Sequence, residues 1–219
     1  LKLFNFLPDM MKELNKNEIN YGLCRIIAGY GWKWVSKKSK KPDAIIDGVE
    51  LFWNRVPHDW INSTKDLNEM GCIHTTQGYD LNYAAVIFGK EINYNKSNKC
   101  IEIDPNNYFD LNGKKGISDP EILKEYIINI YKTIMYRGIK GTFIYAYNKE
   151  LREYLSQHIE TFRNEIPFRI LRNDEVKPFV NSIPLVDISA AAGNFSDLQV
   201  HSELTWVEPP FNIAVQKGY

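Results

Sequence analysis

The fold is decided by residues 71–89, which read GCIHTTQGYDLNYAAVIFG. The end of this stretch, residues 83–89, is apolar throughout, which is typical of a parallel strand covered on both faces. Its beginning, residues 71–75, is predicted to be a short strand, and the polar residues between the two strands form a turn. Turns at the edge of an α/β sheet are where ligands bind. Gly78 would let the backbone approach a phosphate and Asp80 could accept a hydrogen bond from a ribose, although an ordinary β-turn with a solvated Asp80 explains the local pattern as well.

Helices and strands alternate on both sides of this stretch. Apolar runs predict strands over 23–28, 100–103 and 141–147, and a hairpin over 44–53 turning at Asp47-Gly48. Helices are predicted over 8–17, 118–136 and 149–158. In the helix over 118–136, Ser118 is predicted as the N-cap and Glu121 completes a capping box. One face of the long helix is predicted to carry Ile122, Tyr126, Ile127, Ile130 and Ile134. Alternation of this kind predicts an α/β fold with a largely parallel sheet between two helical layers.

Arg137 stands between the long helix and the strand over 141–147, just before Gly138. A basic residue at the end of a helix is explained by the helix dipole. The functional alternative is an arginine finger, which stabilises charge on a phosphoryl group in transfer.

Three stretches together resemble one protein family: YGLCRIIAGYGWKW (21–34), GCIHTTQGYDLNYAAVIFG (71–89) and NIYKTIMYRGIKGTFIYAY (129–147). They are similar to motifs V and VI of superfamily 1 helicases, and most of all to the family that includes the group III Schlafen helicase domain. The resemblance covers roughly residues 1–160. It implies the second RecA-like lobe of a helicase.

The resemblance also implies roles for single residues. Gln77 and Gly78 match the motif V residues near the γ-phosphate, and Asp80 stands where many relatives carry a Glu that contacts the ribose. Arg137 matches the motif VI arginine finger, preceded by Tyr136 in place of the usual Thr.

Two further residues, His74 and Thr75, match positions near the nucleic-acid backbone. The implied ligands are therefore ATP with Mg²⁺ and a strand of DNA or RNA.

The sequence contains no GxxxxGK[ST] motif, and Asn112-Gly113-Lys114-Lys115-Gly116 has neither its spacing nor its Ser/Thr. The phosphate cradle is thus expected on an N-terminal P-loop lobe of the same protein, outside these residues. The chain alone is expected not to hydrolyse ATP.

Residues 32–41 combine basic and aromatic side chains, a composition that can bind single-stranded nucleic acid. The candidate contacts are Trp32, Trp34, Lys37 and Lys38. A solvated loop with its indoles packed inward is the alternative.

The last part of the sequence differs in character. Prolines punctuate residues 166–182, which are predicted to link a domain over 1–165 to a truncated, β-rich segment over 183–219. That segment resembles the start of a LexA/UmuD-type serine peptidase domain, in which Ala192–Gly193 matches the self-cleavage bond. A flexible linker is the alternative.

Composition sets outer limits. Lys plus Arg equals Asp plus Glu, 27 each, so any nucleic-acid surface is local. No apolar run approaches the ~20 residues of a membrane span, no signal peptide is recognised, and the three cysteines lack the spacing of a metal site. We expect a cytoplasmic protein without a metal site of its own, part of an ATP-dependent helicase or translocase. A non-catalytic nucleic-acid-binding or stress-response regulatory module is the alternative.

Overall fold

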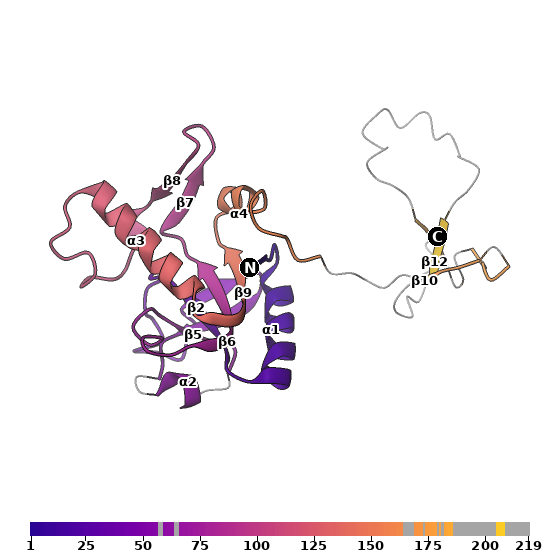
Figure 1. The fold of residues 1–219 in the computed structure, drawn as a ribbon, viewed down its shortest axis with the longest axis horizontal. Coiled ribbons are helices and arrows are strands. Elements are labelled where there is room, and N and C mark those ends of the chain that lie inside the picture. The colour runs from indigo at the N-terminus through magenta and orange to yellow at the C-terminus, as the bar shows by residue number, and fades with distance from the viewer. Residues whose placement is uncertain are drawn as a thin grey trace. The chain divides into compact units, whose positions relative to one another are not determined.

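The chain divides into two units, residues 1–163 and 164–219 (Figure 1). The computed structural model describes residues 1–56, 59–63, 66–163, 169–172, 174–178, 180, 182–185 and 205–208. Each unit is considered by itself.

A seven-stranded sheet forms the centre of the first unit, in the order β1-β9-β6-β2-β5-β4-β3. Its strands are β1 (Lys2–Leu3), β2 (Cys24–Ala28), β3 (Ala44–Ile46), β4 (Val49–Trp53), β5 (Glu69–Gly71), β6 (Leu81–Phe88) and β9 (Gly138–Ala146). All neighbouring strands are parallel except β3 and β4, which form the predicted hairpin. Every residue of β2 is buried, as expected for the middle strand of a covered parallel sheet.

Helices cover both faces of this sheet (Figure 1). Helix α1 (Leu7–Tyr21) buries Leu7, Met10 and Leu14 against one face, and helix α3 (Pro120–Met135) contributes to the core on the other face. The predicted three-layer α/β architecture is confirmed, and it is consistent with a RecA-like fold.

The start of α1 depends on the β3–β4 hairpin. Phe6, at the N-cap position, makes no side-chain capping bond, and the Leu7 amide donates instead to Asp47 Oδ2 at 2.9 Å. Asp47 and Gly48 both have positive φ, 50° and 82°, as the tightest hairpin turns require. The turn predicted from Asp47-Gly48 therefore also caps a helix.

Helix α3 differs in detail from its prediction. Its N-cap is Asp119 and not Ser118, because the Asp119 side chain accepts the Glu121 amide at 2.9 Å. Its buried face is shifted from the predicted one: Ile122 is exposed and Tyr126 only partly buried, and the buried residues are Leu123, Ile127, Ile130, Tyr131 and Ile134.

The remaining elements of the first unit are short. They are α2 (Trp60–Ser63), β7 (Ile92–Asn95), β8 (Cys100–Ile103), the 3-10 helix η1 (Pro105–Asn107) and α4 (Lys149–Leu155). Strands β7 and β8 pair as a separate antiparallel hairpin, of which the sequence predicted only β8. The strand predicted over 71–75 is wrong in place: β5 ends at Gly71, and residues 73–78 form turns.

In the second unit, β10 (Arg169–Ile170), β12 (Thr205–Glu208) and β11 (Ile183–Leu185) form a small antiparallel sheet in that order. Strand β10 falls inside the predicted linker. Ala192 and Gly193 lie outside the described residues. Among the helices that the structure describes, none has the length and apolarity to cross a lipid bilayer.

Candidate functional site

The loop between β5 and β6, residues 72–80, is held in shape by hydrogen bonds from its own threonine side chains to its backbone. The Thr75 hydroxyl accepts the Cys72 amide at 2.7 Å and donates to the Cys72 carbonyl at 2.9 Å. The hydroxyl of buried Thr76 approaches the carbonyls of Cys72 and Ile73 at 3.1 and 3.2 Å. The loop is therefore coiled tightly, and the hydroxyl of Thr75 is used to shape it.

At its far end the loop brings Asp80 to Arg137. Asp80 Oδ1 lies 3.8 Å from Arg137 Nη1. The two residues precede the first residues of β6 and β9, Leu81 and Gly138, which pair with each other. This ion pair therefore lies at the amino edge of the neighbouring strands β6 and β9.

The backbone of Arg137 is fixed on both sides. Its amide donates to Ile134 at 3.2 Å, and its carbonyl accepts from Leu81 at 2.8 Å. The next residue must be glycine, because a Cβ at Gly138 would lie 2.2 Å from the Gly141 carbonyl oxygen. The backbone from which the Arg137 side chain extends is therefore fixed at the amino edge of the sheet.

The side chain of Arg137 keeps binding capacity. Its Nε is buried and donates no hydrogen bond within the described part of the chain. The ion pair at 3.8 Å is long, and the Asp80 side chain is 64% exposed, so solvent screening makes the pair weak. The Arg137 side chain is 24% exposed, and the exposed edge of a planar guanidinium suits a phosphate or carboxylate.

Gln77 and Gly78 lie in the same loop and are exposed. Gly78 has φ of +82°, a left-handed conformation that favours glycine, and no atom within 4 Å would meet a Cβ there. The prediction that these residues face a phosphate remains a prediction.

His74 lies near the other edge of the sheet, where β2 and β5 end. Its ring centroid is 6.1 Å from that of Tyr30, whose hydroxyl donates to Cys72 Sγ at 3.4 Å. His74 Nε2 lies 4.0 Å from Asp110 Oδ2, a pair that carries opposite charges when the imidazole is protonated. The two predicted groups thus separate: Asp80 and Arg137 at the amino edge, His74 near the carboxyl edge.

The predicted basic segment, residues 32–41, follows the carboxyl end of β2. Asp43 links this segment to β4, because its two carboxylate oxygens accept hydrogen bonds from the backbone amides of Ser36 at 2.7 Å and Trp53 at 2.6 Å. Lys37 and Lys38 are exposed, and Lys37 Nζ lies 4.8 Å from the centre of the Trp34 ring.

The two tryptophans of this segment have different environments. Trp34 is 40% exposed, whereas Trp32 is only 7% exposed and belongs to the core cluster under α1. The prediction that Trp32 contacts nucleic acid is therefore wrong for this structure, because its indole already packs among core side chains. Trp34 keeps a face for stacking.

A buried carboxylate that sequence reasoning missed follows β6. Glu91 is fully buried, and Tyr131 of α3 donates to its Oε1 at 2.5 Å, while its Oε2 has no hydrogen-bond partner among the described residues. Burial raises the pKa of Glu91 to about 7. A lone Glu after an apolar strand carries no sequence signal that would have revealed this pair.

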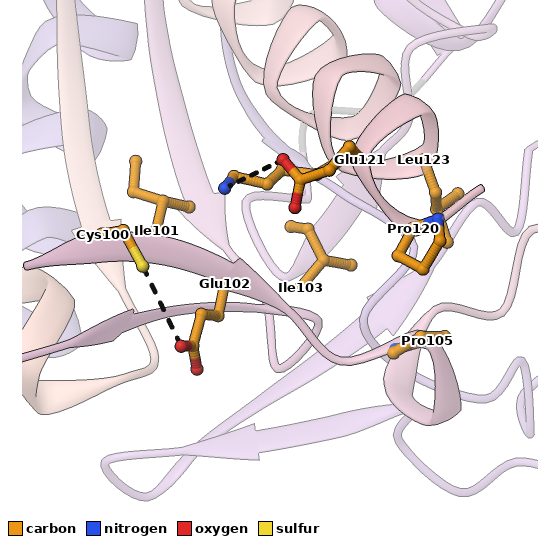
Figure 2. Close-up of a pocket in the computed structure, with 9 residues that line it drawn as sticks. Cys100, Ile101, Glu102, Ile103, Pro105, Pro120, Glu121 and Leu123 are labelled. Carbon is orange, nitrogen blue, oxygen red and sulfur yellow. Dashed lines mark hydrogen bonds and ion pairs between the residues drawn. The ribbon is translucent and has the colours of Figure 1, made fainter. Parts of the chain in front are cut away.

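A pocket of about 280 Å³ lies between β8 and the start of α3 (Figure 2). Its polar groups pair with one another: Glu121 with Lys124 at 3.4 Å, and the Cys100 thiol with Glu102 at 3.9 Å. The pocket lies at the start of α3, about 24 Å from the end of the helix that leads to Arg137. Within the described residues, no three His, Cys, Asp or Glu side chains gather as a metal would require.

Most of the first unit is similar to a known protein family. Residues 1–148 match the family model described as Schlafen group 3, DNA/RNA helicase domain. The chain belongs to this Schlafen group 3 helicase-domain family. It is 33% identical over 162 residues to an uncharacterized protein of Saccharomyces cerevisiae, YPL245W, covering 70% of this chain and 36% of that protein. No solved structure matches the chain.

The Schlafen-type chain thus spans about a third of the length of that curated relative. Membership supports a nucleic-acid helicase-like domain over residues 1–148. The roles predicted for Gln77, Asp80 and Arg137 belong to the proposal that follows, as does any activity of a longer protein.

Proposed function

We propose that the first unit is the second lobe of an ATP-dependent helicase or translocase, and that it supplies Arg137 to an ATP site completed by a P-loop lobe of the same protein. The observation that carries this proposal is the Asp80–Arg137 pair at the amino edge of β6 and β9. The Arg137 side chain is 24% exposed beside Asp80, and an exposed guanidinium edge of this kind fits the phosphates of ATP.

In this proposal each group has a distinct task. Arg137 stabilises the negative charge that develops on the γ-phosphoryl group, and the Asp80 carboxylate accepts a hydrogen bond from the ribose. Gln77 and Gly78 line the same edge. Bound Mg²⁺ would neutralise phosphate charge, held by residues of the P-loop lobe, since the printed sequence has no P-loop motif.

The nucleic-acid strand would bind near the opposite, carboxyl edge. Trp34, Lys37 and Lys38 supply a stacking face and positive charge, and His74 lies near the same edge. Strand β6 has eight residues, so the two edges are separated by about 26 Å. One lobe could then bind nucleotide and nucleic acid at the same time.

A test uses the protein that carries both lobes. Arg137→Ala should lower kcat for ATP hydrolysis by roughly 10³-fold while the Kd for ATP changes little, because an arginine finger acts on transition-state charge. Lys132→Ala is the matched control, since Lys132 is the exposed cation in the last turn of α3. The 219-residue chain alone should show no turnover.

A non-catalytic nucleic-acid-binding or regulatory module is the second candidate. It is favoured by the ion pair itself, in which Asp80 partly neutralises Arg137, and by Tyr136 in place of the Thr that the resemblance to motif VI implies. Normal turnover by a stable Arg137→Ala protein would replace the motor proposal with this one.

A further inference from the structure

The carboxyl edge holds a second hollow that none of the predicted residues lines. It has a volume of about 330 Å³ and follows the ends of β6 and β9. Its lining is mostly polar and includes one aromatic ring: Lys90, Asn93, Asp104, Asn107, Tyr147, Asn148 and Lys149.

Tyr147 is the aromatic residue of this hollow. It is 41% exposed, and its amide donates to the Phe88 carbonyl at 2.9 Å, which fixes the backbone of Tyr147 beside β6. Its ring lies 6.3 Å from that of Trp32, at 84°. Because Trp32 begins the basic segment, the start of that segment lies beside the aromatic ring of the hollow.

The two exposed rings of this edge share an arrangement. Lys90 Nζ lies 5.1 Å from the centre of the Tyr147 ring, as Lys37 Nζ lies 4.8 Å from that of Trp34. The attraction of an exposed ammonium to a ring is weaker than the stacking of a nucleobase on it. A base could therefore displace the flexible lysine, which would then be free to contact the adjacent phosphate.

The interior of the hollow suits a base better than a phosphate. The Asn93 and Asn107 amides each use one N–H within the protein, toward the Lys90 carbonyl at 3.3 Å and Asp104 Oδ2 at 2.7 Å. Each amide keeps a second N–H and a carbonyl oxygen, so it can donate to and accept from the edge of a base, while the negative Asp104 carboxylate, which already accepts the Asn106 amide, repels phosphate oxygens. The lysines are the parts that attract a phosphate.

We infer that this hollow binds one base of a single-stranded nucleic acid, stacked on Tyr147, with Lys90 at the neighbouring phosphate. The inference rests on the proposed function, because it extends the strand bound by Trp34 and Lys37 toward the ends of β6 and β9.

The test is a pair of fluorescence-anisotropy titrations of the 219-residue chain. One probe is a labelled 20-nucleotide oligothymidylate, and the other is a strand of equal length whose sugars carry no bases. Tyr147→Leu should weaken binding of oligothymidylate about 10-fold or more and leave the abasic strand unaffected, because only bases stack. Tyr147→Phe, which keeps the ring, should bind like the wild type, and Lys90→Glu should weaken binding of both strands.

Several results would overturn the inference. The first is that Tyr147→Leu binds oligothymidylate as tightly as the wild type. The second is that Tyr147→Leu loses affinity for both strands equally while its Tm is unchanged. If Tyr147→Leu does not fold, normal binding of both strands by Lys90→Glu overturns it. If the Tyr147 and Lys90 variants bind normally but Lys37→Ala/Lys38→Ala weakens binding, the inference about the hollow is wrong and the proposed function stands. If the wild type binds neither strand, the proposed function is wrong as well.

Discussion

Asp80 and Arg137, whose side chains meet at 3.8 Å, come from opposite ends of a long crossover: β6, the β7–β8 hairpin and α3 lie between them in the chain. They meet because β6 and β9 are parallel neighbours whose first residues pair. Two residues from separate sequence motifs thus form one polar site. The site is open to solvent, since the Asp80 side chain is 64% exposed and the Arg137 side chain 24% exposed.

Substitution of Asp80 separates binding from chemistry. In the protein that carries both lobes, Asp80→Asn should raise KM for ATP roughly 10-fold, because a hydrogen bond between a ribose hydroxyl and a charged acceptor contributes about 1.5–3 kcal/mol. The value of kcat should change little, since the ribose is remote from the transferred phosphoryl group. Steady-state kinetics with ATP measure both quantities.

Glu50→Gln, an exposed change on β4, is the control for this experiment. A wild-type KM in Asp80→Asn would reject the ribose contact. A lower kcat at normal KM would instead indicate that Asp80 acts by orienting Arg137.

The main strands of the sheet could be predicted from the sequence, because a run of apolar residues is a signal that needs no knowledge of tertiary contacts. Strands β2, β6 and β9 are each buried over most of their length and were found from composition alone. Strand β1 has two residues and β7 reads INYN, so neither has an apolar run to reveal it. The strand predicted over 71–75 is displaced because Thr75 and Thr76 form hydrogen bonds that coil the loop, and such competition does not appear in hydrophobicity.

The candidate site was less accessible from sequence. The prediction of Asp80 and Arg137 depended on the family resemblance, since each alone fits an ordinary turn or helix end. Burial of Trp32 beside exposed Trp34 could not be read from the pattern Trp-Lys-Trp, because the two indoles share the same local sequence. Tertiary packing decides which one faces solvent.

Glu91 should make stability depend on pH. Burial raises its pKa from 4.5 to about 7 in the folded chain, so between these values the folded state binds more protons than the unfolded state. The free energy of unfolding should therefore decrease as pH rises from about 4.5 to about 7, and then level off. The pKa shift corresponds to about 3 kcal/mol in the free energy of unfolding.

Glu91→Gln removes the titration and should be more stable than the wild type at pH 8 but not at pH 4.5. Urea unfolding of both proteins at these two pH values measures the difference. The Tyr131 hydroxyl keeps an acceptor in the amide, so the packing is retained. An equal pH dependence in the two proteins would exclude Glu91 as its source.

The exposed lysines of the basic segment should act through phosphate contacts. Lys37→Ala/Lys38→Ala should weaken single-strand binding and reduce the slope of log K against log salt by about 1.4, at about 0.7 for each contact with a single strand. Lys12→Ala/Lys16→Ala removes the same charge from the exposed side of α1 and is the matched control. Equal losses in both double variants would indicate nonspecific attraction.

The two tryptophans provide the sharpest contrast, because they lie two residues apart and differ in burial. Trp34→Ala should weaken single-strand binding by about 1–3 kcal/mol, the contribution of one stacked base, and leave the Tm near that of the wild type. Trp32→Ala should instead cost about 3–5 kcal/mol of stability, the usual effect of emptying a large core position. Anisotropy titrations and thermal melts of the same two proteins give both quantities.

A conservative pair of variants completes this prediction. Trp34→Phe keeps an aromatic face and should retain most of the binding energy, whereas Trp32→Phe should still lower the Tm, because the smaller ring leaves part of the core position empty. The burial values of 40% and 7% thus predict opposite phenotypes for neighbouring tryptophans. Loss of strand binding by a folded Trp32→Phe protein, with Trp34→Ala unaffected, would place the nucleic-acid contact beneath the segment and not on its surface.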